Sequence, residues 1–133
     1  MKPADMQAIA RLAQLREELK AGIDADAESY NQVMAAYKQA KTLSDGDFLI
    51  DSALKIATDV PLQTAQKARE VLEIVESLRP ITNPNMASDL IVAGALAKAA
   101  ITGALANVEI NLSSLKDASF TTDVRSTVRR IQG

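Results

Sequence analysis

The sequence predicts an all-α protein, an up-and-down bundle of long helices built from one domain over residues 1–133 and completed by dimerisation. Apolar residues recur at alternating steps of three and four, which is the spacing of one helix face. Proline and asparagine gather between such stretches, and no stretch alternates as a strand does. With two Tyr, two Phe and no Trp, the core must be aliphatic. Small side chains bury little area each, so this core needs many helix contacts or a partner chain.

The first predicted helix covers residues 3–41. Pro3 suits a first helical turn, and Gly22 is the only glycine in the stretch. A helix of about 38 residues spans roughly 57 Å, which is longer than a small globule needs and favours a partner chain. The predicted core-facing positions are Ile9, Leu12, Arg16, Leu19, Ile23, Asp26, Tyr30, Val33 and Tyr37.

The second predicted helix follows a polar turn over residues 42–47, in which Ser44 and Asp47 are spaced like a helix start. Apolar positions continue on both sides of Pro61 and stop before Pro80. A proline inside a helix removes one backbone hydrogen bond and either kinks or ends the helix. Because the periodicity resumes after Pro61, we expect one kinked helix rather than two.

A loop rich in Pro and Asn, residues 79–87, leads to the third predicted helix, which Ser88 or Asp89 caps and which reaches about residue 111. Small residues recur along one of its faces and permit close helix packing. Residues 90–108 are the one membrane candidate, but Lys98 near their middle and the abundance of Ala and Gly favour a buried helix of a soluble protein. A polar break over residues 113–120 and a short helix from about residue 122 complete the bundle.

The composition excludes several kinds of site. The chain has no Cys, hence no disulfide and no thiolate ligand, and no His, the commonest general base and metal ligand. We therefore expect no metal, and acid–base chemistry from carboxylates, Lys or Tyr. The net charge of −2 gives no reason to expect nucleic-acid binding. The first 14 residues lack the apolar core of a signal peptide, so we expect a cytoplasmic protein without a membrane partner.

Three polar features stand out, and two of them fall on helix faces where apolar or small residues are expected. Asp26 lies on the apolar seam of the first helix, where it either reaches solvent at the seam edge or is held with a raised pKa for proton transfer. Asn107 and Asn111 continue the small-residue face of the third helix, where they either cross-link helices or hold a polar ligand. The loop before the third helix opens onto a helix N-terminus, which favours an anion, although Ser88 and Asp89 also suit a simple cap.

Four segments resemble the cyclodeaminase domain of formiminotransferase-cyclodeaminase and the related bacterial methenyltetrahydrofolate cyclohydrolases. Residues 24–37 read DADAESYNQVMAAY, residues 57–62 read ATDVPL, residues 83–89 read NPNMASD and residues 107–117 read NVEINLSSLKD. They occur in the expected order and span about three quarters of the chain.

The resemblance implies a dimeric helical protein that acts on a tetrahydrofolate derivative without a metal. It implies that Asp26 and Asp89 transfer protons and that Lys41 attracts the folate glutamate tail. The other residues implied to bind substrate are Tyr30, Asn83, Asn85, Ser88, Asn107 and Asn111. The implied reaction is either the release of ammonia from formiminotetrahydrofolate or the hydration of a methenyl bridge.

The sequence also departs from the family pattern. Nothing like the family's glycine-rich loop and first helix precedes Lys2, so relative to the family the chain is expected to be N-terminally truncated. The Leu-Pro-Lys that follows the first matched segment in the family reads Gln39-Ala40-Lys41 here. These departures motivate an alternative hypothesis, a non-catalytic helical module that associates with itself, with a full-length relative or with another protein.

Overall fold

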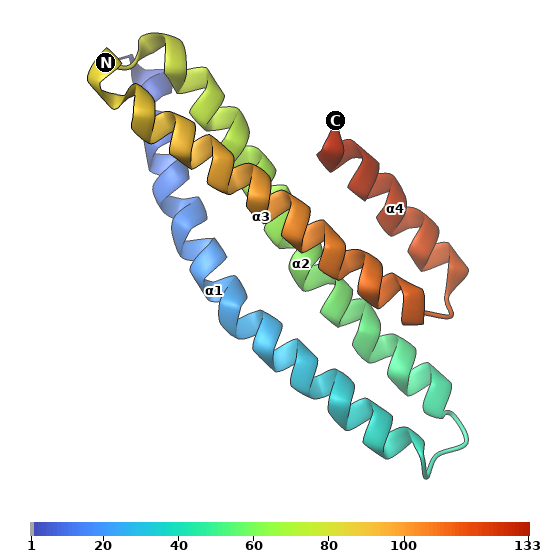
Figure 1. The fold of residues 1–133 in the computed structure, drawn as a ribbon. Coiled ribbons are helices and arrows are strands. Elements are labelled where there is room, and N and C mark those ends of the chain that lie inside the picture. Colours follow the sequence, from blue (N-terminus) through green and yellow to red (C-terminus); the bar gives the residue numbers. More distant parts are fainter. Residues whose placement is uncertain (1) are drawn as a thin grey trace.

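The computed structural model describes residues 2–133, and it consists of long helices that run antiparallel to their neighbours in sequence (Figure 1). The helices are α1 (Pro3–Ala40), α2 (Gly46–Leu78), α3 (Ala87–Ser114) and α4 (Ala118–Gln132), with two 3-10 turns, η1 (Arg79–Ile81) and η2 (Pro84–Met86), between α2 and α3. The described residues contain no strand. The all-α prediction is confirmed, whereas dimerisation stays a prediction.

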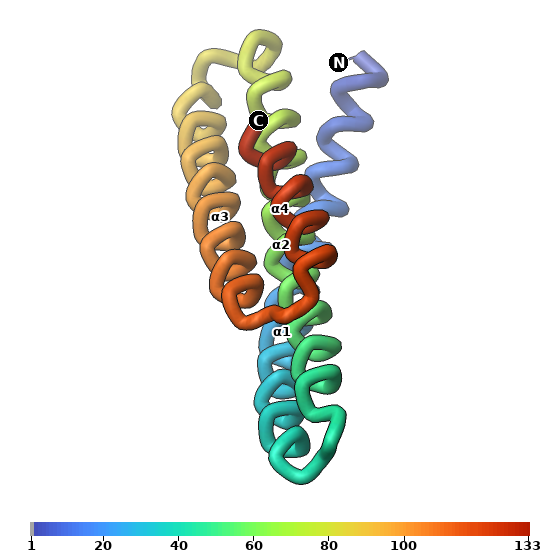
Figure 2. The backbone as a smooth tube through the Cα atoms, turned by 90° about the vertical axis from the view of Figure 1, so that its right-hand side faces the viewer, coloured from blue at the N-terminus to red at the C-terminus, as the bar shows by residue number. Residues whose placement is uncertain are grey.

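Helix α2 is the centre of the arrangement, because α1, α3 and α4 each pack against it. Figure 2 shows α1 and α3 on different sides of α2, with α4 lying across the side of α2 and α3. The larger core cluster joins residues of α2, α3 and α4, and a smaller one of Val33, Leu54 and Ala57 joins α1 to α2. Both clusters are aliphatic, as the composition predicts.

The first two helices agree closely with the sequence prediction. Helix α1 ends at Ala40, one residue before the predicted end, and α2 passes through Pro61 as one helix. The predicted start at Ser44 and Asp47 is wrong, since α2 begins at Gly46 without a side-chain cap. The turn packs tightly there: a Cβ on residue 46 would lie 2.6 Å from the Ala40 carbonyl oxygen, so only glycine fits.

The later helix starts needed correction. Neither Ser88 nor Asp89 caps α3, because the helix already begins at Ala87 and continues from the η2 turn. Helix α4 begins at Ala118, about one turn before the predicted residue 122. Its start is fixed by Asp117, whose carboxylate accepts a hydrogen bond from the Phe120 N–H at 3.0 Å.

The buried stripe of α1 differs from the predicted seam. The residues that become buried are Leu15, Ser29, Val33 and Ala36. On the predicted seam, by contrast, Ile23 is 71% exposed and Tyr30 is 61% exposed. The physical reason is that α1 packs along a single helix, α2, so one chain covers only a narrow strip of its apolar surface.

Helix α3 is also less buried than expected. The helical stretch Pro84–Ser114 is long and apolar enough to cross a membrane, yet only 22% of its most apolar part is buried in the protein. One such helix is weak support for a membrane span, since core helices of soluble proteins pass the same test. The prediction of a buried helix holds for only a small part of α3 in the single chain, and the absence of a membrane partner stays a prediction.

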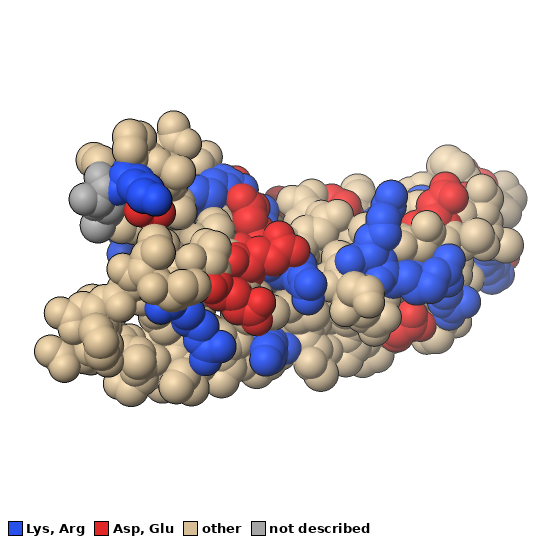
Figure 3. Space-filling view, turned by 90° about the horizontal axis from the view of Figure 1, so that it is seen from above, with Lys and Arg blue, Asp and Glu red and all other residues tan. Residues whose placement is uncertain are grey.

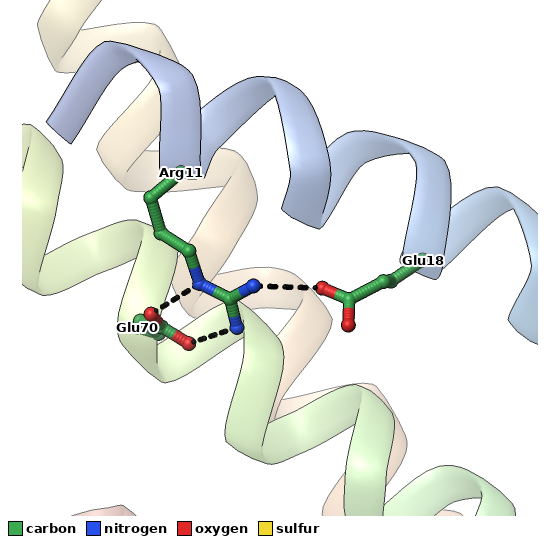
Figure 4. Close-up of polar contacts among 3 residues, drawn as sticks. All are labelled: Arg11, Glu18 and Glu70. Atoms are coloured by element: carbon green, nitrogen blue, oxygen red, sulfur yellow. Dashed lines mark hydrogen bonds and ion pairs between the residues drawn. The ribbon is translucent and has the colours of Figure 1, made fainter. Parts of the chain in front are cut away.

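An ion-pair cluster fastens α1 to α2 near one end of the molecule (Figure 4). The Arg11 guanidinium donates to both carboxylate oxygens of Glu70, at 2.7 and 2.9 Å, and to Glu18 at 3.1 Å. These hydrogen bonds hold the pKa of Glu70 below its usual range and raise the pKa of Arg11. The cluster therefore links α1 to α2 in addition to their apolar packing.

A second cluster fixes the connection between α3 and α4. The Asp51 carboxylate accepts the backbone N–H groups of Lys116 and Asp117, at 3.0 and 2.9 Å. The Lys55 ammonium donates to Asp117 at 2.7 Å and lies 5.5 Å from the centre of the Phe120 ring. Both Asp51 and Lys55 belong to α2, so this cluster holds the start of α4 on the central helix.

Candidate functional site

A cleft lies between α1 and α3, with residues of α2 as its floor. It encloses a volume of about 580 Å³. Leu54, Ala57 and Pro61 of α2 line its base, and both flanking helices supply polar side chains. A smaller hollow of about 310 Å³ shares Asp26, Pro61 and Asn107 with the cleft and extends it along the same side of α2. The combined space has the size of ordinary small-molecule sites.

The α1 wall of this cleft carries Asp26 together with aromatic side chains. Asp26, Tyr30 and Tyr37 recur at helical spacing and line the same space. The Asp26 side chain is exposed, as the seam-edge interpretation expects, and at the same time it borders the cleft. An exposed carboxylate on the same wall as two phenol rings can accept hydrogen bonds from a bound ligand.

The α3 wall carries the two asparagines, which have different roles. Pro61 has no N–H, so the Ala57 carbonyl loses its partner within α2. The Asn111 amide replaces that partner by donating to the Ala57 oxygen at 3.1 Å. Asn111 therefore cross-links α3 to α2, as the structural interpretation expects, and explains why α2 continues past its proline.

Asn107 lies one turn before Asn111 and is exposed. Among the hydrogen bonds of the described residues none involves its side chain, so its amide is available to a ligand in the cleft. Both amide groups, N–H and C=O, can then bind complementary groups of a heterocycle. Of the sequence candidates, the structure thus brings together Asp26, Tyr30, Asn107 and Asn111.

The remaining candidates lie elsewhere. Lys41 is exposed in the turn after α1, at the opposite end of the molecule from the α2–α3 connection. The other four, all exposed, belong to that connection or to the first turn of α3: Asn83, Asn85, Ser88 and Asp89. Asp89 precedes Asn107 by 18 residues, which is about 27 Å along α3 at 1.5 Å per residue.

Within the α2–α3 connection, Asn83 has a local task. Its side-chain oxygen accepts the Asn85 N–H at 3.0 Å and so shapes the η2 turn. Asp89 stands in the first turn of α3, where a carboxylate is favourable next to the free N–H groups. In one chain these residues do not reach the cleft.

Several lining residues were missed as site candidates by sequence reasoning. Tyr37 was placed on the seam but not in the site, although it follows Asp26 by three helical turns. Pro61 is predicted only to kink its helix, although it lies in the matched segment over residues 57–62. The signal for Tyr37 was its helical spacing from Asp26, which is visible once the α1 face toward the cleft is known. Pro61 carried no such signal.

Metal binding has no support in the described side chains. Residues 2–133 contain no group of three or more Asp or Glu side chains placed to hold a metal ion. The expectation that the site works without a metal stays a prediction.

Fold and cleft together define an all-helical protein with a small-molecule-sized, polar-walled cleft between two long parallel helices. The sequence profile of the family described as formiminotransferase-cyclodeaminase matches residues 2–130. The chain therefore belongs to the formiminotransferase-cyclodeaminase family, which confirms the resemblance drawn from the four segments.

Two relatives support this assignment. The chain is 36% identical over 110 residues to a methenyltetrahydrofolate cyclohydrolase of Methylorubrum extorquens, covering 80% of this chain and 53% of the relative. It is 32% identical over 124 residues to a formimidoyltransferase-cyclodeaminase of Gallus gallus, covering 90% of this chain and 23% of the relative. The chain thus spans about half the length of the first relative and about a quarter of the second.

Proposed function

We propose that this chain binds a reduced folate in the cleft between α1 and α3 and acts on its one-carbon unit. The substrate would be formimino- or methenyl-tetrahydrofolate, and the reaction would be loss of ammonia or hydration of the methenyl bridge. The observation that carries the proposal is the meeting of Asp26, Tyr30 and Asn107 in one cleft of about 580 Å³. The names of the two relatives support the choice of substrate.

The cleft suits a flat, polar heterocycle. Phenol rings such as those of Tyr30 and Tyr37 offer apolar faces for stacking and hydroxyl groups for hydrogen bonding. The Asn107 amide can pair with ring N–H and C=O groups, while the aliphatic floor from α2 excludes water from below. We propose the cytoplasm as the compartment of this protein.

Asp26 is the proposed proton-transfer group. Both candidate reactions move a proton at the one-carbon centre, and the chain has no His or Cys to do so. Asp26 is the carboxylate that lines the cleft, and its exposure leaves it free to exchange protons with water between turnovers. Lys41 lies too far along α1 to join it and is proposed only as a distant attraction for the glutamate tail.

The test is the substitution Asp26→Asn, which keeps the shape and removes the ionisable group. We expect kcat to fall by about 10²- to 10⁴-fold. Ammonia release and loss of methenyl absorbance should be followed separately, so that the reaction is identified in the same experiment. Asp24→Asn is the matched control, because Asp24 is an exposed carboxylate on the same helix outside the cleft. Undiminished turnover by Asp26→Asn would remove Asp26 from the mechanism.

We further propose that a second copy of the chain packs against the exposed side of α3. Leu96 is 66% exposed and Ile110 65% exposed on this helix. Asp89 and Asn107 are five helical turns apart and so lie on the same side of α3. An antiparallel pair of α3 helices centred near residue 98 would set Asp89 of each copy opposite Asn107 of the other.

Subunit mixing tests this arrangement. Asp26→Asn and Asp89→Asn should each be inactive, and a mixture of the two should recover about a quarter of the activity, because half of the dimers carry one intact site.

Leu96→Glu should give monomers by light scattering, whereas Ile56→Glu, at an exposed apolar position of α2, should not. Full activity of the monomeric double variant Leu96→Glu/Asp89→Asn would contradict the shared site.

The alternative function is a non-catalytic helical module that associates with itself or with another protein. The observation that favours it is that five of the nine candidate residues lie outside the cleft in one chain. It predicts an assembled protein with neither folate binding nor turnover. A saturable folate-dependent rise in melting temperature would rule it out.

A further inference from the structure

A second groove runs along the opposite side of α3, between α3 and α4, and encloses about 750 Å³. Its floor is apolar and comes from three helices, with Leu72 from α2, Ile101 and Leu105 from α3, and Val128 and Ile131 from α4. These residues belong to the main core cluster, so the floor is fixed by packing.

The rim of this groove is basic. Its cations are Arg69 of α2, Lys98 of α3, and Arg125 and Arg129 of α4, against one carboxylate, Glu109. Figure 3 shows basic side chains gathered over the part of the molecule where Figure 1 places α4, while acidic side chains gather over α2. The groove therefore combines an apolar base with a positive edge.

Two of the four cations are already paired. Arg125 contacts Glu109 at 3.3 Å, and Arg69 contacts Glu73 at 3.1 Å. For Lys98 and Arg129 the described residues provide no carboxylate oxygen within 4.0 Å. These two side chains extend from different helices that line one groove, which is an arrangement suited to an anionic group between them.

The groove is independent of the folate cleft. Residues 98, 101, 102, 105 and 109 face the groove, whereas residues 107, 110, 111 and 114 face the cleft. At 100° per residue these two sets lie on opposite sides of α3. A ligand in one therefore does not touch a ligand in the other within the same chain.

We propose that the α3–α4 groove binds an amphipathic organic anion, an apolar molecule that carries a carboxylate. The apolar body lies on Leu72, Leu105 and Val128, and the carboxylate is held by Lys98 and Arg129. The volume of the groove falls in the range of small-molecule sites. The apolar floor and the basic rim together define the ligand. The apolar floor excludes a purely hydrophilic anion, and the basic rim favours an anion over a neutral lipid.

Calorimetric titration of the full chain with sodium decanoate tests the proposal, with 1-decanol and sodium phosphate as comparison ligands. We expect saturable decanoate binding and at least tenfold weaker binding of both comparison ligands. Lys98→Ala and Arg129→Ala should each weaken decanoate about tenfold, the effect of losing one charge-assisted hydrogen bond. Lys38→Ala, at an exposed cation of α1, should leave it unchanged.

Two further variants separate binding from folding. Lys98→Arg with Arg129→Lys keeps both charges and should keep the affinity, and all variants should melt within a few degrees of the parent. Equal binding of decanol and decanoate, equal binding of phosphate, or no effect of removing the two cations would overturn the proposal. Displacement of decanoate by a reduced folate would also overturn it, because the groove would then belong to the folate site.

Discussion

The two hollows beside α3 are built from the same helix and differ in chemistry. Toward α1, the cleft holds a carboxylate, phenol rings and amides over a floor that contains Pro61. Toward α4, the groove holds Leu, Ile and Val under a rim of Arg and Lys. The helical period sorts these residues to opposite sides, so one helix can serve two unlike ligands. The comparison teaches that a helix of low amphipathicity can still carry two well-defined faces.

The largest loss of stability should come from breaking the hydrogen bond between Asn111 and the Ala57 carbonyl. Both residues line the cleft and neither lines the groove. Asn111→Ala leaves that carbonyl without its 3.1 Å partner, at a cost of about 1–3 kcal/mol in the free energy of unfolding. In a Pro61→Ala background, residue 61 regains an N–H that can bond to Ala57, so the same substitution should cost less. Chemical denaturation of the four proteins measures this coupling.

A coupling near zero between Asn111→Ala and Pro61→Ala would mean that Asn111 does not replace the hydrogen bond lost at the proline. Ser113→Ala is a suitable control, because the Ser113 hydroxyl only donates to the Ile110 carbonyl of its own helix. Its effect should not depend on residue 61.

A smaller loss of stability should come from the α3–α4 side of the molecule. Asp51→Ala removes the acceptor of two backbone N–H groups at the α3–α4 connection and should lower stability by about 1 kcal/mol. Amide exchange should speed up at the start of α4 and stay unchanged in the middle of α1. Asp59→Ala is the control, because among the described residues this exposed carboxylate of α2 pairs only with Gln63. Faster amide exchange in α1 would show that α1 and the α3–α4 connection do not open independently.

The smallest effect concerns pH. Hydrogen bonds from Arg11 hold the pKa of Glu70 below its ordinary value of 4.5. Because the folded pKa is the lower one, the stabilisation is fully present above the unfolded value and is lost as pH falls through the folded pKa. The melting-temperature difference between the parent and Glu70→Gln should therefore be largest near neutral pH and shrink below about pH 4.5. Glu76→Gln, at an exposed carboxylate of the same helix, is the matched control variant.

The helices could largely be predicted from the sequence, because periodicity and proline positions are local signals. The start of α4 was misplaced although Asp117 is a local cap signal, and the support of Asp117 by Asp51 and Lys55, more than 60 residues earlier in the chain, required the fold. The buried side of α1 was misplaced for a related reason. Apolar residues occur on every helix face that another helix or a partner chain covers. Within the single chain, only one face of α1 is covered.

The candidate site was predicted in part. Asp26 and Asn107 were singled out as polar residues on apolar or small-residue faces, and the structure places both on the same cleft. The separation of Asp89 from Asn107 follows from the predicted helix, since 18 residues at 1.5 Å each give about 27 Å, whereas the meeting of Asp26 with Asn107 required the fold. The role of Asn111 also required the fold, since its partner is a backbone carbonyl of another helix.

The most direct test of the account is a thermal-shift titration with a reduced folate, carried out on the parent, on Asn107→Ala and on Lys98→Ala/Arg129→Ala. The account predicts a saturable stabilisation of the parent, about 2.7 kcal/mol at a hundredfold excess over the dissociation constant. The shift should be reduced in Asn107→Ala and retained in the groove variant. A cooperative melt with no shift in the parent, or a shift lost only in the groove variant, would contradict the placement of the folate site between α1 and α3.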